Sequence, residues 1–291
     1  MTNKKKIILF SIIGVCVLGI ITTTTLFLVM NVFRKGKKQD EMVRIEDYDT
    51  NYDEVYVSLN EKLAAKNYEQ IISESTDFDI IQYSLSKKVN EKHYYSITKG
   101  TSKALIATQD IYATFIKNND QYYQESISAG LINTAKCFYT YDNETKEYSG
   151  KVNSDKESAT YDSSNFTKYT KEELFEELGF DYSKPTIYLI HKDTLVSSEK
   201  EKDNDNNLVI KASLNPTLST LKYIRQQKHM GSLEVYPEFS KVELTFTIDK
   251  ELNLLSLRSV ETSRVKKGIW VTNNTDMIES FIYEAKEIPE I

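Results

Sequence analysis

The sequence predicts an α+β protein in which an N-terminal transmembrane helix precedes an antiparallel β-sheet covered on one face by helices. Three observations support this prediction. Residues 7–33 carry no charged side chain, and from residue 93 onward strand-like runs alternate with turn residues. Two stretches among those runs have helix-capping signals. The 291 residues are enough for an anchor and one domain of about 200–250 residues.

Residues 7–33 are expected to cross a membrane. A helix of this length spans about 40 Å, against about 30 Å for the hydrocarbon core of a bilayer. A cleaved signal peptide needs a shorter apolar core and small residues at its cleavage site, whereas the first alanine of the chain is Ala64. We therefore expect a single-pass signal anchor in the cell membrane, with residues 1–6 in the cytoplasm. Long domains are translocated largely regardless of flanking charge, so the C-terminal domain is expected outside the cell.

The region after the span changes from basic to acidic. Four basic residues are predicted to contact lipid head groups: Arg34, Lys35, Lys37 and Lys38. The stretch 39–54, QDEMVRIEDYDTNYDE, has no apolar periodicity. Residues 34–54 are therefore predicted as a basic, then acidic stalk, followed by an extracellular α+β domain at 55–291.

The charge balance excludes nucleic acid as a partner. The first 38 residues hold seven Lys and Arg, which leaves 30 basic against 43 acidic residues and a formal charge of −13 for the rest. Nucleic-acid binding depends on clustered Lys and Arg side chains, and a domain of this charge is repelled by phosphates. Cys137 is alone in the soluble part, so no disulfide is possible within the domain.

The domain begins with helical patterns and continues with strands. Residues 55–90 permit one or two short helices. The strand-like runs that follow are rich in Tyr and β-branched residues, and lie at 93–98, 104–117, 121–130, 136–142 and 146–152. A capping box predicts a helix at 170–178, and an Asn-Pro start predicts a second helix at 216–230. The remaining predicted strands are 186–198, 207–214, 232–249, 254–268 and 277–288.

Residues 241–261, KVELTFTIDKELNLLSLRSVE, predict a β-hairpin whose turn places Asn253 in a left-handed conformation. Apolar and polar side chains alternate along its first strand, so one face is expected to point inward. Together with two residues of an earlier strand, this inward row is the predicted wall of a hydrophobic cavity: Tyr188, Ile190, Val242, Leu244, Phe246 and Ile248. The alternative is that these side chains pack directly against the helices.

Catalytic and metal-binding patterns are mostly missing, and no cofactor is expected. The chain has no G-x-S-x-G, P-loop, Rossmann or H-E-x-x-H motif. The order of motifs in penicillin-recognising enzymes is matched by Ser84–Lys87, Ser163–Asn165 and Lys266–Gly268. However, S-x-x-K occurs five times in this chain, and the third motif lacks its hydroxyl. The run 203–207 resembles a calcium loop without its Gly and Glu, so a hairpin turn is predicted there.

The stretch 215–249, with NPTLSTLKYIRQQ, YPEF and KVELTFTID, resembles envelope proteins of Gram-positive bacteria that are similar to the LolA/LppX lipoprotein-carrier fold. YYQESISAG, KCFYTYDNETKEYSG and the closing FIYEAKEIPEI resemble the same proteins. The resemblance covers residues 93–291 in element order. It implies a strongly curved sheet, or half-barrel, whose concave face is plugged by helices over a hydrophobic cavity, and it implies no catalytic residues. Carriers leave the membrane or are lipid-anchored, whereas a tethered domain cannot shuttle far.

Three functions remain open at this point. The first is a membrane-anchored, non-enzymatic extracellular module that binds a lipid, another amphiphile or a partner protein at the cell envelope. The second is an assembly subunit of an envelope secretion or conjugation machine, which predicts self-association or a protein partner and no cavity. The third is a cell-wall enzyme, which requires a serine and a lysine to meet in space.

Overall fold

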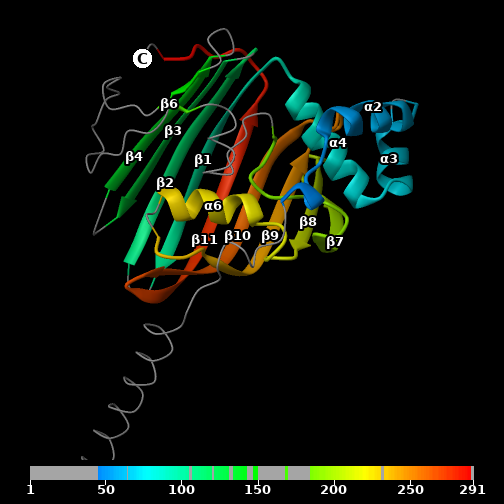
Figure 1. Cartoon of the computed structure of the whole chain (residues 1–291). Helices are drawn as coiled ribbons and strands as arrows, with labels where there is room; N and C mark the ends of the chain where they lie inside the picture. The colour runs from blue at the N-terminus through cyan, green and yellow to red at the C-terminus, as the bar shows by residue number, and fades with distance from the viewer. Residues whose placement is uncertain are drawn as a thin grey trace, which may run out of the picture.

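The computed structural model describes most of the chain from residue 45 onward. The described residues are 45–63, 65–104, 107–119, 121–130, 134–142, 147–149, 168–169, 184–230 and 233–289. They contain an antiparallel sheet of eleven strands in the order β6-β5-β4-β3-β2-β1-β11-β10-β9-β8-β7. The sheet is curved and open, with β6 and β7 as its two edges (Figure 1). The predicted α+β class with an antiparallel sheet is confirmed.

The strands form two halves that meet at the centre of the sheet. One half contains β1 His93–Ala104, β2 Ala107–Asn118, β3 Gln121–Gly130, β4 Thr134–Asp142, β5 Glu147–Ser149 and β6 Lys168–Tyr169. The other contains β7 Leu195–Lys202, β8 Leu208–Leu214, β9 Glu238–Ile248, β10 Leu254–Lys267 and β11 Ile269–Ile282. The halves join through β1 and β11, from Tyr95 opposite Ile282 to Ala104 opposite Asn273. The first and last strands of the sequence therefore form the middle of the sheet.

Helices cover one face of the sheet, which we call the inner face. They are the 3₁₀-helix η2 Ile45–Tyr48 and the α-helices α2 Tyr52–Leu63, α3 Tyr68–Glu74, α4 Asp77–Asn90 and α6 Leu221–Met230. Both α4 and α6 pack into one hydrophobic core with the inner side of β8 and β9, and α2 packs on α4 (Figure 1). Residues 55–90 hold three helices rather than one or two. Asn67 forms a capping box with Gln70, and Thr76 caps α4, so the helix restarts twice.

The domain begins ten residues earlier than predicted. Ile45 is only 1% exposed and Tyr52 is buried, so residues 45–54 are not a solvated stalk. The apolar side chains of this acidic stretch pack into the core, while Asp49 forms ion pairs with lysines from distant parts of the chain. The acidic composition of this stretch concealed these contacts, because its charges are partly paired rather than all solvated.

Several predicted features lie outside the described residues. They are the membrane span 7–33, the basic residues Arg34, Lys35, Lys37 and Lys38, and the helix at 170–178. Within the part of the chain that the structure describes, none of the helices combines the length and the apolar character needed to cross a bilayer.

The predicted strand 186–198 is replaced by a non-strand segment and a shorter strand. Residues 184–191, which we call the strap, cross the inner face without joining the sheet, and β7 begins only at Leu195. The strap makes its hydrogen bonds elsewhere: the Leu189 N–H donates to the Ser219 carbonyl, and the Ile190 carbonyl accepts from Gln82 Nε2. A run of apolar residues therefore satisfies its backbone through helices and turns instead of a neighbouring strand.

Helix α6 begins at Leu221 instead of Pro216. The Asn215 side chain caps the preceding turn, since its Oδ1 accepts from the N–H groups of Thr217 and Leu218. The hydroxyls of Ser219 and Thr220 then donate to the carbonyls of Asn215 and Pro216 four residues earlier. Such local side-chain bonds compete with regular helix geometry, which delays the regular helix by five residues.

Two hairpin turns share one design. In the β9–β10 turn, Leu252 has a φ of +64°, whereas Asn253 was predicted to be left-handed. The Asp249 carboxylate accepts from both the backbone N–H and the side-chain amide of Asn253, at 2.8 Å each. The predicted turn at 203–207 is confirmed and has the same pair of hydrogen bonds. The Asp203 carboxylate accepts from the backbone N–H and from the side-chain amide of Asn207. In both turns the residue with the left-handed conformation comes directly before the Asn whose N–H groups bond to the Asp.

Candidate functional site

The predicted cavity wall is part of a packed core. Leu244, Phe246 and Ile248 have no exposed surface, and Val242 is 1% exposed. They lie in the same cluster as side chains of α4 and α6. A side chain without exposed surface lines no space that a water molecule can enter. The alternative expectation, direct packing against helices, therefore describes these four residues.

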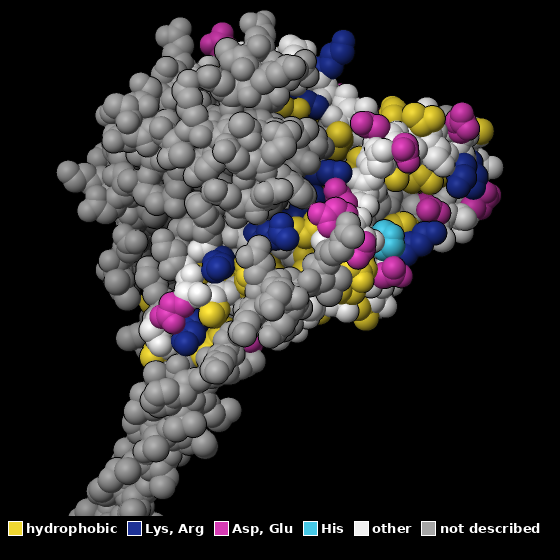
Figure 2. Space-filling model, in the orientation of Figure 1, with side chains coloured by type: hydrophobic (Ala, Val, Ile, Leu, Met, Phe, Trp, Pro, Cys, Tyr) yellow, Lys and Arg dark blue, Asp and Glu magenta, His cyan; other side chains and the backbone are white. Residues whose placement is uncertain are grey.

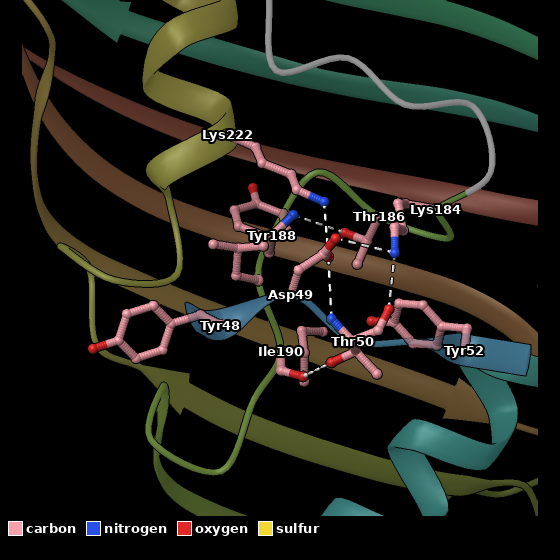
Figure 3. A pocket seen from close by; sticks show the side chains of 10 residues that line it. Tyr48, Asp49, Thr50, Tyr52, Lys184, Thr186, Tyr188, Ile190 and Lys222 are labelled. Carbon is pink, nitrogen blue, oxygen red and sulfur yellow. Dashed lines mark hydrogen bonds and ion pairs between the residues drawn. The ribbon is translucent and has the colours of Figure 1, made fainter. Parts of the chain in front are cut away.

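Tyr188 and Ile190 belong to the same core, but they reach it from the strap and not from a strand. Both also line a small pocket where the strap meets η2 and α6 (Figure 3). The pocket has no room for a water molecule in this structure. Of the six predicted cavity residues, Tyr188 and Ile190 are the two that line this pocket.

An ion-pair cluster fills this pocket. Asp49 Oδ1 accepts from Lys222 Nζ at 3.0 Å, and Asp49 Oδ2 lies 3.1 Å from Lys184 Nζ. Lys184 also donates to the Thr50 carbonyl at 2.9 Å, and the Thr50 hydroxyl donates to the Ile190 carbonyl (Figure 3). Burial raises the pKa of Asp49, but the two ammonium groups outweigh it and hold that pKa below its usual value. We call Asp49, Lys184 and Lys222 the carboxylate clasp.

The sequence did not reveal the clasp. Lys222 is a charged residue of the helix predicted at 216–230, yet its side chain is only 3% exposed. Asp49 was assigned to a solvated stalk. The three residues come from the N-terminal segment, the strap and α6, so no spacing in the sequence connects them. Figure 2 shows basic and acidic side chains side by side on the described surface near α6.

A β-bulge in β10 changes which side chains face inward. Leu254 lies opposite Ile248 and Ser256 lies opposite Thr247, so Leu255 is an extra residue in the strand. An extra residue reverses the alternation of every residue that follows it. As a result Glu261 is buried at 2% exposure, although the apolar Val260 beside it is only half-buried.

Glu261 is an isolated acid among the buried inner-face residues of β10. The Tyr188 hydroxyl donates a hydrogen bond to it from the strap. Burial raises the pKa of Glu261 to about 8, so the carboxyl is neutral near pH 7.

A second buried ionisable residue, Lys88, lies on α4. Its Nζ donates a hydrogen bond to the Pro185 carbonyl at 2.9 Å and lies 3.9 Å from the centroid of the Phe281 ring. Burial lowers the pKa of Lys88 to about 8.

The central strands have the same reversed polarity. In β1, Ser96 faces inward and is 1% exposed, while Ile97 faces outward and is 37% exposed. In β11, Ile278 is 42% exposed, while Glu279 faces inward and accepts a 2.6 Å hydrogen bond from Ser96 Oγ. At these positions the polar side chain faces inward and the apolar one outward, although Tyr94 and Phe281 of the same two strands are buried in the inner core.

These outward side chains form a continuous group that we call the outer patch: Ile97, Lys99, Tyr112 and Ile278. Lys99 is opposite Tyr112 on β2 and opposite Ile278 on β11, so the three lie in one row across the strands. Ile97 is two residues along the strand from Lys99, on the same face. Tyr112 is 46% exposed. The sequence did not reveal this patch, because the pairing of β1 with β11 and β2 decides which side chains share a row.

The serine and the lysine of the first candidate enzyme motif do not form a hydrogen bond with each other. The Ser84 hydroxyl is wholly buried on α4 and has no hydrogen-bond partner, while Lys87 donates to the Glu251 carbonyl. The motif Ser163–Asn165 lies outside the described residues. A search of the described residues finds no group of His, Cys, Asp and Glu side chains that could hold a metal ion.

Comparison with known proteins adds little. No protein-family model and no curated protein matches the chain. Among solved structures, it is similar to the 1.75 Å crystal structure of a DUF1329 family protein from Desulfovibrio piger, with 9% identity and a TM-score of 0.22. The match covers 70% of this chain and 89% of that chain. A likeness of this size carries no argument about function, so the function is argued from the surfaces above.

Proposed function

We propose that this chain is a membrane-anchored, non-enzymatic extracellular module that binds a partner protein through the outer patch. Residues 7–33 hold it in the cell membrane, and the half-barrel sheet presents its outer face to the envelope. The observation that carries the proposal is the exposure of Ile97 and Ile278 on the outer face, while Ser96 and Glu279 next to them face inward. Exposed apolar side chains there do not contribute to the core, and their place on the outside is expected where another surface covers them.

The chemistry of the outer patch suits a protein surface. It combines an aromatic residue, two branched aliphatic residues and one lysine. The neighbouring Arg258 and Asp276 form a bidentate ion pair at 2.7 and 2.9 Å, which supplies a polar rim. Protein interfaces commonly have apolar centres enriched in aromatic residues within a polar rim. An amphiphile in the inner face would instead have to displace packed side chains such as Phe246.

Site-specific photo-crosslinking in the cells that produce the protein tests this proposal. A benzophenone amino acid replaces Tyr112 in the full-length chain, and the matched control places it at Val57 of α2, which is 62% exposed. We expect a discrete protein adduct from position 112 and none from 57. The adduct should disappear when Ile97→Lys and Ile278→Lys are added to the folded chain. Absence of any protein adduct from 112, or equal labelling from 57, would overturn the proposal.

The mass of the adduct separates this function from the assembly-subunit alternative. An adduct of about twice the mass of the chain would identify a second copy of the protein, as a self-associating subunit of an envelope machine requires. An adduct of any other mass would identify a different protein, which mass spectrometry of the excised band would name.

A further inference from the structure

The carboxylate clasp has the composition of an anion-binding site with its anion in place. Two ammonium groups converge on one carboxylate, and each contacts a different oxygen, at 3.0 and 3.1 Å. A phosphate or carboxylate group is bound by lysines in the same manner. Here the anion is Asp49, a residue of the same chain.

The cationic half of the clasp is built into the domain. Lys222 lies in the first turn of α6, directly after Ser219 and Thr220, which are buried and hydrogen-bonded to the preceding turn. Lys184 lies on the strap, which is tied to the turn before α6 through the Leu189 N–H and the Ser219 carbonyl at 2.8 Å. The backbone that carries each lysine is therefore attached to the domain through contacts other than Asp49, although the Lys184 ammonium group itself contacts Asp49 and Thr50.

The carboxylate of the clasp, Asp49, belongs to a segment that is attached to the domain less strongly than the segments that carry the two lysines. Ile45–Thr50 consists of a four-residue 3₁₀-helix and two residues that follow it, and it joins no strand of the described sheet. It is held by the burial of Ile45, by the packing of Tyr48 on the core and by the polar contacts of Asp49 and Thr50. A short segment without strand pairing opens at a lower free energy than the sheet and core beneath it.

We propose that Lys184 and Lys222 form an anion-binding site that Asp49 occupies in cis, and that an external phosphate or carboxylate group takes this site when the segment Ile45–Thr50 moves away. The walls beside the clasp are the aromatic rings of Tyr48, Tyr52 and Tyr188. They suit an anion that is attached to an apolar body, and a free anion uses the same two ammonium groups. This site lies on the inner side of the sheet and is separate from the outer patch.

The test compares Asp49→Ala with Asp47→Ala in the full-length chain in neutral detergent. Asp47 lies in the same 3₁₀-helix but is exposed, so it controls for loss of a charge in this segment. Thermal unfolding is followed with increasing inorganic phosphate, at constant ionic strength set with chloride. We expect a saturable rise in Tm of about 5 °C for Asp49→Ala. The wild type and Asp47→Ala should not respond, and adding Lys184→Met to Asp49→Ala should remove the response.

A second set of measurements identifies the chemical source of the anion. A second variant keeps the proposal testable if the first variant does not fold. Short-chain phosphatidic acid replaces phosphate, so a response to lipid alone points to a lipid head group, whereas a response to both points to the phosphate group itself. If Asp49→Ala does not fold, Asp49→Asn keeps the shape of the side chain and decides the question. A folded variant at position 49 that responds to neither probe overturns the proposal, as does an equal response of Asp47→Ala. The outer patch does not enter this test, so its failure leaves the proposed function standing.

Discussion

The inner rows of β9 and β10 lie on adjacent strands and are buried to the same degree, but they differ in chemistry at two facing pairs. Leu244 faces Ser259, and Val242 faces Glu261, across the same ladder. All four are at most 5% exposed. On β9 the buried side chains are the apolar ones of an alternating pattern. On β10 the bulge at Leu255 turns Ser259 and Glu261 inward beside the apolar Leu257, so the burial of these two polar residues is decided by register.

The difference shows that the β9 and β10 rows of the inner face contribute differently to the domain. The β9 row provides the apolar area that stabilises the domain, together with α4 and α6. The β10 row instead holds hydrogen-bonding groups beneath the strap, at a cost in desolvation. The apolar residues displaced from the inner side of the central strands lie on the outer face, where they form the outer patch.

The largest effect is expected from truncating the apolar row. Phe246→Ala removes a wholly buried ring and should lower the free energy of unfolding by about 3–5 kcal/mol, through lost burial and the cavity left behind. Urea unfolding of the full chain in detergent micelles measures this loss. A loss below about 1 kcal/mol would mean that the ring lines open space, contrary to the packed core described here.

Glu261→Gln should change how stability depends on pH. The folded-state pKa of Glu261 is about 8, above the ordinary value of 4.5, so the unfolded chain releases this proton first as pH rises. Wild-type stability should therefore fall relative to the variant by about 1.4 kcal/mol per pH unit between pH 5 and pH 8. Urea unfolding of both proteins at pH 5, 6.5 and 8 checks the slope. The exposed Glu243→Gln is the control, and parallel curves for wild type and Glu261→Gln would contradict the prediction.

Removing the hydroxyl of Tyr188 tests the link between the strap and β10. Tyr188→Phe leaves the buried Glu261 without the hydrogen bond it receives from the strap, which should cost about 1–3 kcal/mol of stability. In a Glu261→Leu background the same change should cost much less, because there is no acid left to satisfy. A double-mutant cycle by urea unfolding measures this coupling, and equal costs in the two backgrounds would show that the bond contributes nothing.

The smallest effect is expected on the outer face. Ile278→Lys changes an exposed apolar side chain, and surface substitutions usually alter stability by less than about 0.5 kcal/mol. Urea unfolding should place the variant beside the wild type even though its partner adduct is lost. A loss of stability comparable to that of Phe246→Ala would instead make Ile278 a core residue and remove the contrast between the two faces.

Features that depend on local chemistry could be predicted from the amino-acid sequence alone. Tyr-rich and β-branched runs marked β1 to β4, and period-two alternation identified Val242 to Ile248 as the inward row. Asn215 was correctly identified as a cap, although the helix after it begins later. These features follow from neighbours within a few residues, where side-chain spacing and backbone hydrogen bonding act directly.

Features that depend on distant partners became visible only in the folded structure. The facing of β10 depends on one extra residue, Leu255, and nothing in its own side chain indicates a bulge. The strap is apolar enough to be a strand, but α4 and the turn before α6 satisfy its backbone instead. Lys222 is buried because Asp49, 173 residues earlier, supplies a carboxylate. Pairing, register and charge compensation act between segments far apart in the chain, so local patterns do not reveal them.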